Sequence, residues 1–423
     1  MTFPVRILIL AAAVLVALTA VPAAAAPGVL DPLFGTDGWV TAFPLGSQGQ
    51  AVAVDQHGRI VVAGTTLDRH VDVAVARFLP DGRPDPGFGG GDGRVRVNMG
   101  ADEYGLDLAL TDGGGIAIAG RRLTARADRA IVIRLKPDGR PDHGFGGGDG
   151  AVAVDLNARY QGANAIAFAL NGSILAAGFT SNGFGGRLAL FRLTEAGALD
   201  DGFSHDGKAV TDISEGSEQV NDLLVLSGGK ILVAGSGDVG LTPRFLIARY
   251  TSNGGLDETF GRKPGYTFLD LGDGAEAADA LAQQPNGKLV LTGSASDGAN
   301  WGLARVGFNG APDPAFGGDG VRMVSFAKAG GESAAALAIQ TNGRIVVAGR
   351  TKGTKTDLAV ARFRPGGRTD RGFGVDGLAL VDGFGSIDLA RGVALQANGK
   401  IVATGETWRS GRPRFLVSRF LAS

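Results

Sequence analysis

The hydrophobic positions of this chain fall into short runs that are separated by glycine-rich turns. In one stretch, small apolar residues at Ala51–Asp55 lead into a His57-Gly58 turn, after which Ile60–Ala63 is apolar throughout. A run without alternation is typical of a strand that is covered on both faces. Two more runs follow at Val73–Phe78 and Arg94–Val97, the second after a long Gly- and Asp-rich connection. The pattern predicts a unit of four short antiparallel strands.

This unit recurs seven times, at intervals of about 57 residues. Three markers, each found once per unit, are a Gly after the second run (64, 120, 178, 235, 293, 349, 405), an Arg in the third (77, 134, 192, 249, 305, 362, 419) and the Phe of a Phe-Gly pair (34, 88, 145, 203, 260, 316, 373). Asn-Gly pairs between the first two runs suit two-residue hairpin turns. We therefore expect an all-β, seven-bladed β-propeller of four-stranded antiparallel blades.

The two ends of the chain predict how this ring closes. In six units an Asp follows the marker Arg eight residues later, as Asp85 follows Arg77. Arg419 stands four residues from the chain end and has no such Asp, whereas Asp31 precedes the first complete unit. We therefore expect the N-terminal strand Trp39–Phe43 to complete the last blade, which would remove two exposed sheet edges.

The marker Arg and Asp residues have two interpretations, a ring of anion-binding sites or a repeated structural ion pair. Their occurrence once per blade at a fixed spacing favours the structural interpretation, in which each pair ties the third strand to the following loop. The expected pairs are Arg77–Asp85, Arg134–Asp142, Arg192–Asp200, Arg249–Asp257, Arg305–Asp313, Arg362–Asp370 and Arg419–Asp31.

The N-terminus has the pattern of an export signal. Arg6 is the only charge before an apolar run from Ile7 to Val21, which is followed by Pro22 and a group of alanines. A charged start, an apolar run and a small-residue site define a cleavable leader. We expect cleavage after Ala25, so that residues 1–25 are the signal peptide and 26–423 form one propeller in the periplasm, on the cell surface or outside. The alternative is an uncleaved anchor.

Charge and composition argue against several kinds of partner and site. The chain has 41 Lys and Arg against 42 Asp and Glu, and no cysteine. The balanced charge argues against nucleic acid as a partner, and the absence of cysteine excludes disulfides and thiolate metal sites. No later stretch is apolar enough to span a membrane after signal cleavage, and we expect a monomer.

The unit resembles the delta-60 repeat, a family of bacterial exported or surface proteins. The resemblance rests on Asp-Gly-Arg-Pro-Asp-Pro-Gly-Phe-Gly-Gly-Gly-Asp-Gly at 81–93, Asn-Gly-Arg-Ile-Val-Val-Ala-Gly at 342–349 and Asp-Leu-Ala-Val-Ala-Arg-Phe at 357–363. The layout is also similar to that of NHL-type propeller repeats. The resemblance implies a propeller fold and export, but no reaction and no catalytic residues. The fifth unit departs from the pattern at Gly261–Gly265.

Candidate metal sites are few. The Asp residues of the Gly-Asp-Gly loops offer oxygen ligands that Ca²⁺ prefers, but the Asp-Gly pair is also what a turn requires. The histidines fall at non-equivalent positions of the repeat, without metal-ligand spacing. We therefore predict no cofactor and no metal, with Ca²⁺ as the less favoured alternative. The residues considered are Asp37, Asp92, Asp149, Asp206, Asp319 and Asp376, and His57, His70, His143 and His205.

The units differ from one another mainly in the connections after their second and fourth strands. Alternate connections of a blade lie on one face, which we call the variable face; it has the features of a binding surface made of loops, although drift in unconstrained loops is the alternative. We predict a basic rim on this face, around an acidic channel mouth formed by the fourth-to-first connections. The rim residues are Arg121, Arg122, Arg126, Arg129, Arg409, Arg412 and Arg414; the acidic ones include Glu103, Glu218 and Glu276.

A second set of polar residues lies near the starts of the first strands, where the channel is expected. These candidate channel-mouth residues are Asp107, Asn164, Asp222, Asp279 and Arg391. The leading functional expectation is a non-catalytic binding scaffold for an unknown protein or glycan. The alternatives are a hydrolase or lyase with its site at the channel mouth, and a passive envelope protein.

Overall fold

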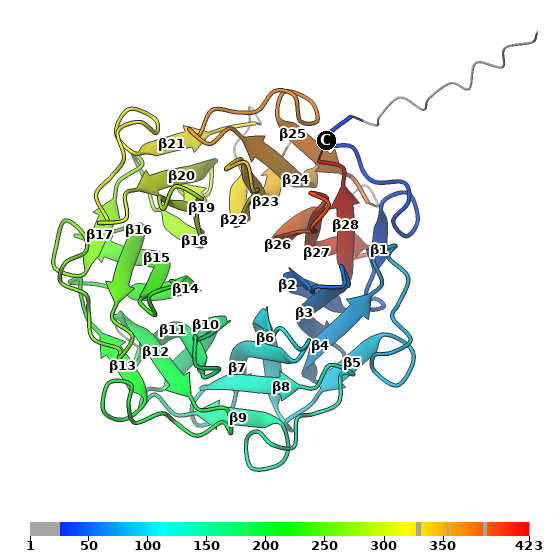
Figure 1. Ribbon diagram of the computed structural model, residues 1–423, viewed down its shortest axis with the longest axis horizontal. Helices are drawn as coiled ribbons and strands as arrows, with labels where there is room; N and C mark the ends of the chain where they lie inside the picture. The colour runs from blue at the N-terminus through cyan, green and yellow to red at the C-terminus, as the bar shows by residue number, and fades with distance from the viewer. Residues whose placement is uncertain (1–25, 184, 327–330, 353–354, 384–386, 423) are drawn as a thin grey trace, which may run out of the picture.

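The computed structural model describes residues 26–183, 185–326, 331–352, 355–383 and 387–422. This described part contains 28 strands and no helix. The strands form seven sheets of four antiparallel strands each, arranged as a ring (Figure 1). The prediction of a seven-bladed β-propeller is therefore confirmed, whereas the predicted signal peptide, residues 1–25, lies outside the described residues.

In blades 1 to 6 the strands run from the axis outward in chain order, and in blade 7 the N-terminal strand takes the outermost place. Blade 1 consists of β2 (Ser47–Val54), β3 (Ile60–Leu67), β4 (Val71–Phe78) and β5 (Arg94–Val97). Blade 2 consists of β6 (Asp102–Leu110), β7 (Ile116–Leu123), β8 (Arg129–Leu135) and β9 (Ala151–Val154). Blade 3 consists of β10 (Tyr160–Phe168), β11 (Ile174–Ser181), β12 (Gly186–Leu193) and β13 (Lys208–Thr211). Blades 4 and 5 are β14 (Glu218–Val225), β15 (Ile231–Val239), β16 (Thr242–Tyr250) and β17 (Tyr266–Leu269); and β18 (Ala277–Gln283), β19 (Leu289–Ala295), β20 (Asn300–Val306) and β21 (Val321–Val324). Blade 6 is β22 (Ser333–Ile339), β23 (Ile345–Lys352), β24 (Thr356–Phe363) and β25 (Leu378–Val381), and blade 7 is β26 (Asp388–Leu395), β27 (Ile401–Arg409), β28 (Arg412–Phe420) and β1 (Trp39–Thr41).

The N-terminal strand closes the ring as the sequence predicts. Strand β1 pairs antiparallel with β28, with Trp39 opposite Ser418 and Thr41 opposite Leu416. It is shorter than the expected Trp39–Phe43, and Pro44, which follows Phe43, has no N–H to continue a ladder. Ala42 still donates one backbone hydrogen bond to Phe415 O.

The hydrophobic core lies between neighbouring blades. The second and third strands of each blade are buried almost along their full length, as in β3 and β24. The seven marker Phe side chains are fully buried at the outer loops. The continuous apolar runs in the sequence therefore correspond to strands that are packed on both faces by adjacent sheets.

The marker glycine of each blade has a specific steric role. A Cβ at Gly64 would overlap with the backbone oxygen of Gln48 on the neighbouring strand. At this point the register between β2 and β3 shifts, because Gln50 is an extra residue between the pairs Gly49–Gly64 and Ala51–Ala63. The glycine thus permits the close approach that accompanies a β-bulge.

Candidate functional site

The β-bulge recurs in the innermost strand of every blade and directs one residue per blade toward the propeller axis. The register shifts after residues 49, 105, 163, 220, 278, 334 and 390. Unlike the marker residues, the bulged residues vary in chemistry from blade to blade. They are Gln50, Leu106, Asn164, Asn221, Asp279, Ala335 and Arg391.

These residues line one axial cavity of about 190 Å³. All five candidate channel-mouth residues take part in its lining: Asp107, Asn164, Asp222, Asp279 and Arg391. Two polar members, Gln50 and Asn221, were missed by the sequence analysis. Both residues follow the residue that pairs with the marker glycine of their blade. A comparison of this position among the seven units would have identified them.

Asp107 and Asp222 follow the bulge in blades 2 and 4 and connect each blade to the next. The Asp107 carboxylate accepts hydrogen bonds from the backbone N–H of Leu108 (2.8 Å) and of Ile166 in blade 3 (2.9 Å). Asp222 accepts equivalent bonds from Leu223 (2.8 Å) and from Leu281 in blade 5 (2.7 Å). Both residues therefore have a structural role within the ring.

The protein environment disfavours the charged forms of these carboxyl groups. Burial raises the pKa of Asp107 to about 6 and, with added repulsion from Asp107, the pKa of Asp222 to about 8. Burial also raises the pKa of Asp279 to about 7. Carboxyl groups that titrate near neutral pH are suited to proton transfer, which makes the axial cavity a candidate acid–base site.

The remaining polar groups of the cavity are partly engaged. Asn164 Nδ2 donates to Val220 O (2.7 Å), and Asn221 Nδ2 donates to Ala278 O (3.0 Å). Arg391 Nη2 lies 3.2 Å from Glu406 Oε1 and forms an ion pair within blade 7. The acidic groups thus belong to blades 2, 4 and 5, and the single cation of the ring belongs to blade 7.

The predicted acidic channel mouth is wrong for three of its acidic residues. Glu103, Glu218 and Glu276 are fully buried at the starts of the first strands. Their carboxylates accept hydrogen bonds from backbone N–H groups of the preceding connection, as Glu276 Oε1 does from Leu271 (2.9 Å). Equivalent buried polar residues occur once per blade, and their role is to cap the chain as it returns toward the axis. They are Ser47, Glu103, Gln161, Glu218, Glu276, Glu332 and Asp388.

The residues of the predicted basic rim lie in the hairpins of blades 2 and 7. Arg122 Nε is 3.2 Å from Glu103 Oε1 and Arg129 Nη2 is 3.0 Å from Asp155 Oδ2. The Arg121 guanidinium lies 5.2 Å from the centre of the Tyr104 ring. The side chains with the most exposure are Arg126, Arg409 and Arg412, while Arg414 is half-buried. The cations thus form two separate groups, and part of their charge is balanced locally.

The variable face is hollowed above blades 3 and 4. One hollow of about 480 Å³ is lined mainly by the loops around Asn157 and Asn182, and a second of about 420 Å³ by loops that carry Asp212 and Glu215. The two share Arg187 in their lining. Tyr160, which is exposed, lies opposite Ser181, a lining residue of the first hollow.

The marker Arg and Asp side chains form ion pairs in all seven blades. The Arg77 Nε–Asp85 Oδ2 and Arg249 Nε–Asp257 Oδ2 distances are both 2.7 Å, and Arg419 Nη2 is 2.7 Å from Asp31 Oδ2. The other pairs are Arg134–Asp142, Arg192–Asp200, Arg305–Asp313 and Arg362–Asp370. Each guanidinium also donates to a backbone oxygen of the following blade, for example Arg249 Nη1 to Phe308 O (2.6 Å). These contacts support a structural interpretation.

The Gly-Asp-Gly loops and the histidines are arranged as turn and surface residues. Asp92 Oδ1 accepts from Arg94 N (2.9 Å) and Asp319 Oδ1 from Val321 N (3.1 Å), the geometry of an Asx turn. The four histidines are exposed. Asp149 and Asp206 accept equivalent hydrogen bonds, from Ala151 N and Lys208 N.

The fold and its repeated positions define the chain as a β-propeller built from sequence repeats. Five segments, 58–88, 227–260, 284–316, 340–373 and 396–423, match the model of a family described as a domain of unknown function (DUF5122) beta-propeller. Together they cover less than half of the chain. No curated protein matches the sequence.

Solved structures of similar fold include enzymes. The chain is 10% identical to the polysaccharide lyase Uly1, with 89% of this chain and 90% of that one covered and a TM-score of 0.50. A puromycin hydrolase is 15% identical, with a TM-score of 0.47; the match covers 88% of this chain but only 54% of the hydrolase. The PQQ-bound aldose sugar dehydrogenase from Streptomyces coelicolor is 16% identical (90% and 96% covered, TM-score 0.41). At these identities the likeness shows the fold alone.

The described residues contain no helix long and apolar enough to cross a membrane.

Proposed function

We propose that this protein is an exported, non-catalytic binding propeller that takes a glycan on its variable face, above blades 3 and 4. The observation that carries this proposal is the pair of adjoining hollows, of about 480 and 420 Å³, that share Arg187. Each is within the range of roughly 300–1,000 Å³ that is usual for ligand sites. Export rests on the N-terminal sequence pattern.

The lining of the hollows suits a ligand that is rich in hydroxyl groups. It includes Asn157, Thr180, Ser181, Asn182 and Asp238, which offer both donors and acceptors of hydrogen bonds. Directly opposed residues of an antiparallel pair project to the same face of the sheet. Tyr160 therefore projects to the same side as Ser181, where its ring, with the Arg159 guanidinium 5.4 Å from the ring centre, offers an aromatic surface beside the polar groups.

The proposal is tested on an array of bacterial and plant oligosaccharides, with the mature protein and three variants. We expect Tyr160→Ala and Asn182→Ala to reduce binding of any retained glycan by at least about tenfold, a loss of roughly 1.4 kcal/mol. Arg126→Ala is the matched control, because Arg126 is exposed on the variable face of blade 2 and should leave binding unchanged. Equal binding by all variants, or no retained glycan, would contradict the proposal.

An enzyme with its site in the axial cavity is the second candidate. It is favoured by the three carboxyl groups whose pKa values are raised to about 6, 8 and 7 in one cavity. If the protein cleaves the glycans it binds, Asp279→Asn should abolish product formation and leave retention on the array intact. Retention without products supports the binding function.

A further inference from the structure

One strand-pair position differs in charge from blade to blade. The first member of this pair is the residue five positions before the marker Arg, on the third strand. It lies opposite the first residue after the fourth strand, one step beyond the last pair between the third and fourth strands. In blades 2 to 4 this position holds an Arg facing an Asp: Arg129–Asp155 (3.0 Å), Arg187–Asp212 (3.1 Å) and Arg244–Asp270 (3.7 Å). In these three blades the carboxylate is therefore neutralised by a guanidinium.

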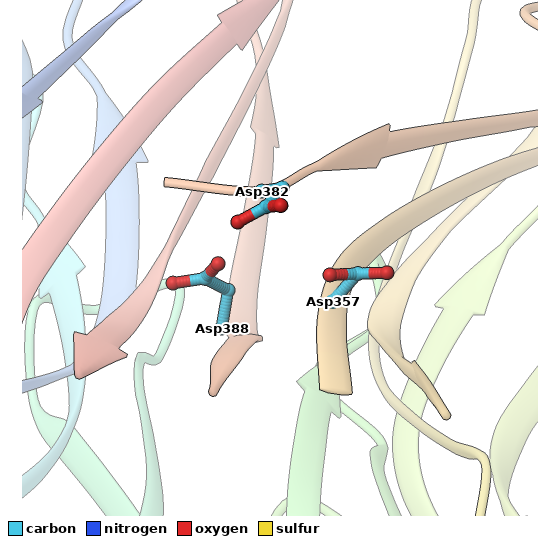
Figure 2. Close-up of side chains that lie close together, drawn as sticks. All are labelled: Asp357, Asp382 and Asp388. Carbon is cyan, nitrogen blue, oxygen red and sulfur yellow. The ribbon is translucent and has the colours of Figure 1, made fainter. Parts of the chain in front are cut away.

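Blade 6 has an Asp at both places. Asp357 stands where blades 2 to 4 have Arg, and it lies opposite Asp382. The buried capping residue of blade 7, Asp388, completes the group, and one carboxylate oxygen from each of the three lies within 4.8 Å of the others. Figure 2 shows the three carboxylates grouped around one space between β24, the end of β25 and the start of β26.

Asp388 is the most constrained member of this cluster. It is fully buried, and its Oδ2 accepts a hydrogen bond from Gly383 N (2.8 Å). Its Oδ1 is buried without a hydrogen-bond partner. Thr407 lies close by, but its hydroxyl forms no hydrogen bond of good geometry. A buried carboxylate oxygen without a partner carries a large desolvation cost, which a bound cation would offset.

One lysine side chain lies beside the cluster. Lys355 Nζ is 3.8 Å from Asp382 Oδ2, and its side chain is 49% exposed, so solvent screens the pair. Burial raises the pKa of Asp388 and of Asp357, and repulsion from Asp382 raises both further. The cluster thus stores repulsion at the junction of blades 6 and 7.

We propose that Asp357, Asp382 and Asp388 form a binding site for Ca²⁺. Oxygens that bind one Ca²⁺ at about 2.3–2.6 Å lie within roughly 5 Å of each other, which matches the spacing of these three carboxylates. The donor set consists of hard oxygens alone, which favours Ca²⁺ over zinc or copper. Water completes the coordination on the exposed side, where Asp382 lies.

Blade 1 shows why an Asp at this position does not by itself make a Ca²⁺ site. Asp72 occupies the place of Asp357, but the facing residue is Asn98, whose Nδ2 donates to Asp72 Oδ1 (2.6 Å). The neighbouring capping residue, Glu103, pairs with Arg122 (3.2 Å). Asp72 is therefore a matched control at the equivalent position.

The test measures Ca²⁺ binding by calorimetry and the thermal midpoint in Ca²⁺ or EDTA, for the mature protein and for Asp357→Arg, Asp382→Asn and Asp72→Asn. We expect Ca²⁺ to raise the thermal midpoint of the unmodified protein and of Asp72→Asn by several degrees. Asp357→Arg, which introduces the Arg found in blades 2 to 4, should show no such rise in Ca²⁺, while its thermal midpoint in EDTA should equal or exceed that of the unmodified protein. Asp382→Asn, at an exposed position, should weaken Ca²⁺ binding by at least about tenfold.

A general loss of stability would lower the thermal midpoint in EDTA as well, so an EDTA midpoint of Asp357→Arg that is not lowered separates loss of the site from damage to the fold. An unmodified protein that does not respond to Ca²⁺, or a full response by Asp357→Arg, would overturn the proposal.

Discussion

At the scale of single residues, the axial cavity is where identical positions have acquired different chemistry. Asp222 illustrates how two roles combine in one side chain, because its carboxylate bridges blades 4 and 5 through backbone N–H groups while burial raises its pKa to about 8. Hydrogen bonds from N–H groups favour the carboxylate, but the loss of solvent outweighs them. The folded state therefore holds a proton that the unfolded chain releases near the ordinary aspartate pKa of 3.8.

This proton predicts a pH-dependent stability. Between about pH 4 and pH 8 the folded state binds more protons than the unfolded state, so the free energy of unfolding falls as the pH rises through this window. One such group contributes a slope of at most about 1.4 kcal/mol per pH unit. We expect Asp222→Asn to flatten the decline of the thermal midpoint between pH 5 and pH 8. Asp92→Asn, in an exposed Asx turn, is the control and should keep the slope of the unmodified protein; an unchanged slope in Asp222→Asn would contradict the assignment.

At the scale of the strand, the link between the marker glycine and the bulge explains what the sequence could and could not predict. Strand order, the seven blades and the axial location of Asn164, Asp279 and Arg391 followed from the repeat. The register shift did not, because a bulge adds one residue without changing the apolar pattern. Asp222 was therefore selected while its neighbour Asn221, the bulged residue itself, was missed.

The capping residues and the acidic cluster were missed for a related reason. The sequence pattern around a Glu at the start of a first strand is the same whether the side chain faces the channel or is buried under a connection. Glu218 is buried. Asp357 is informative only when it is compared with Arg129, Arg187 and Arg244 at the same place in the repeat. The local composition around Asp357 predicts only a loop, whereas the difference between the repeats at this position indicates the acidic cluster.

The steric role of the glycine gives a direct test at this scale. Gly64→Ala places a methyl group against the backbone oxygen of Gln48, which cannot move without breaking the ladder of blade 1. We expect the substitution to lower the free energy of unfolding by roughly 1–3 kcal/mol, measured as a lower thermal midpoint. Gly366→Ala is the control, because nothing lies within 4 Å of its added methyl group; equal midpoints for the two variants would show that the bulge tolerates a side chain.

At the scale of the whole molecule, the closure of the ring has the same side-chain contacts as the junctions between the other blades. Arg419 and Asp31 repeat the contacts that Arg77 and Asp85 make within one continuous segment, although they are separated by 388 positions in the chain. Lys400 Nζ adds a second cation 2.7 Å from Asp31 Oδ2. The guanidinium of Arg419 also donates to Pro80 O in blade 1, so the last blade is joined to the first as any blade is joined to the next.

This equivalence predicts that loss of the pair at the closure is as costly as loss of an internal one. Asp31→Ala leaves Arg419 buried without its carboxylate, as Asp85→Ala leaves Arg77, and both arginines are nearly inaccessible to solvent. Removing one partner of a buried ion pair costs roughly 3–5 kcal/mol, so we expect similar decreases in thermal midpoint for the two variants. Hydrogen exchange should also increase across the β1–β28 pairing in Asp31→Ala. Leu33→Ala changes the same N-terminal segment at an exposed position and should have little effect. A large cost for Asp85→Ala with none for Asp31→Ala would mean that the N-terminal segment adds little to the stability of the ring.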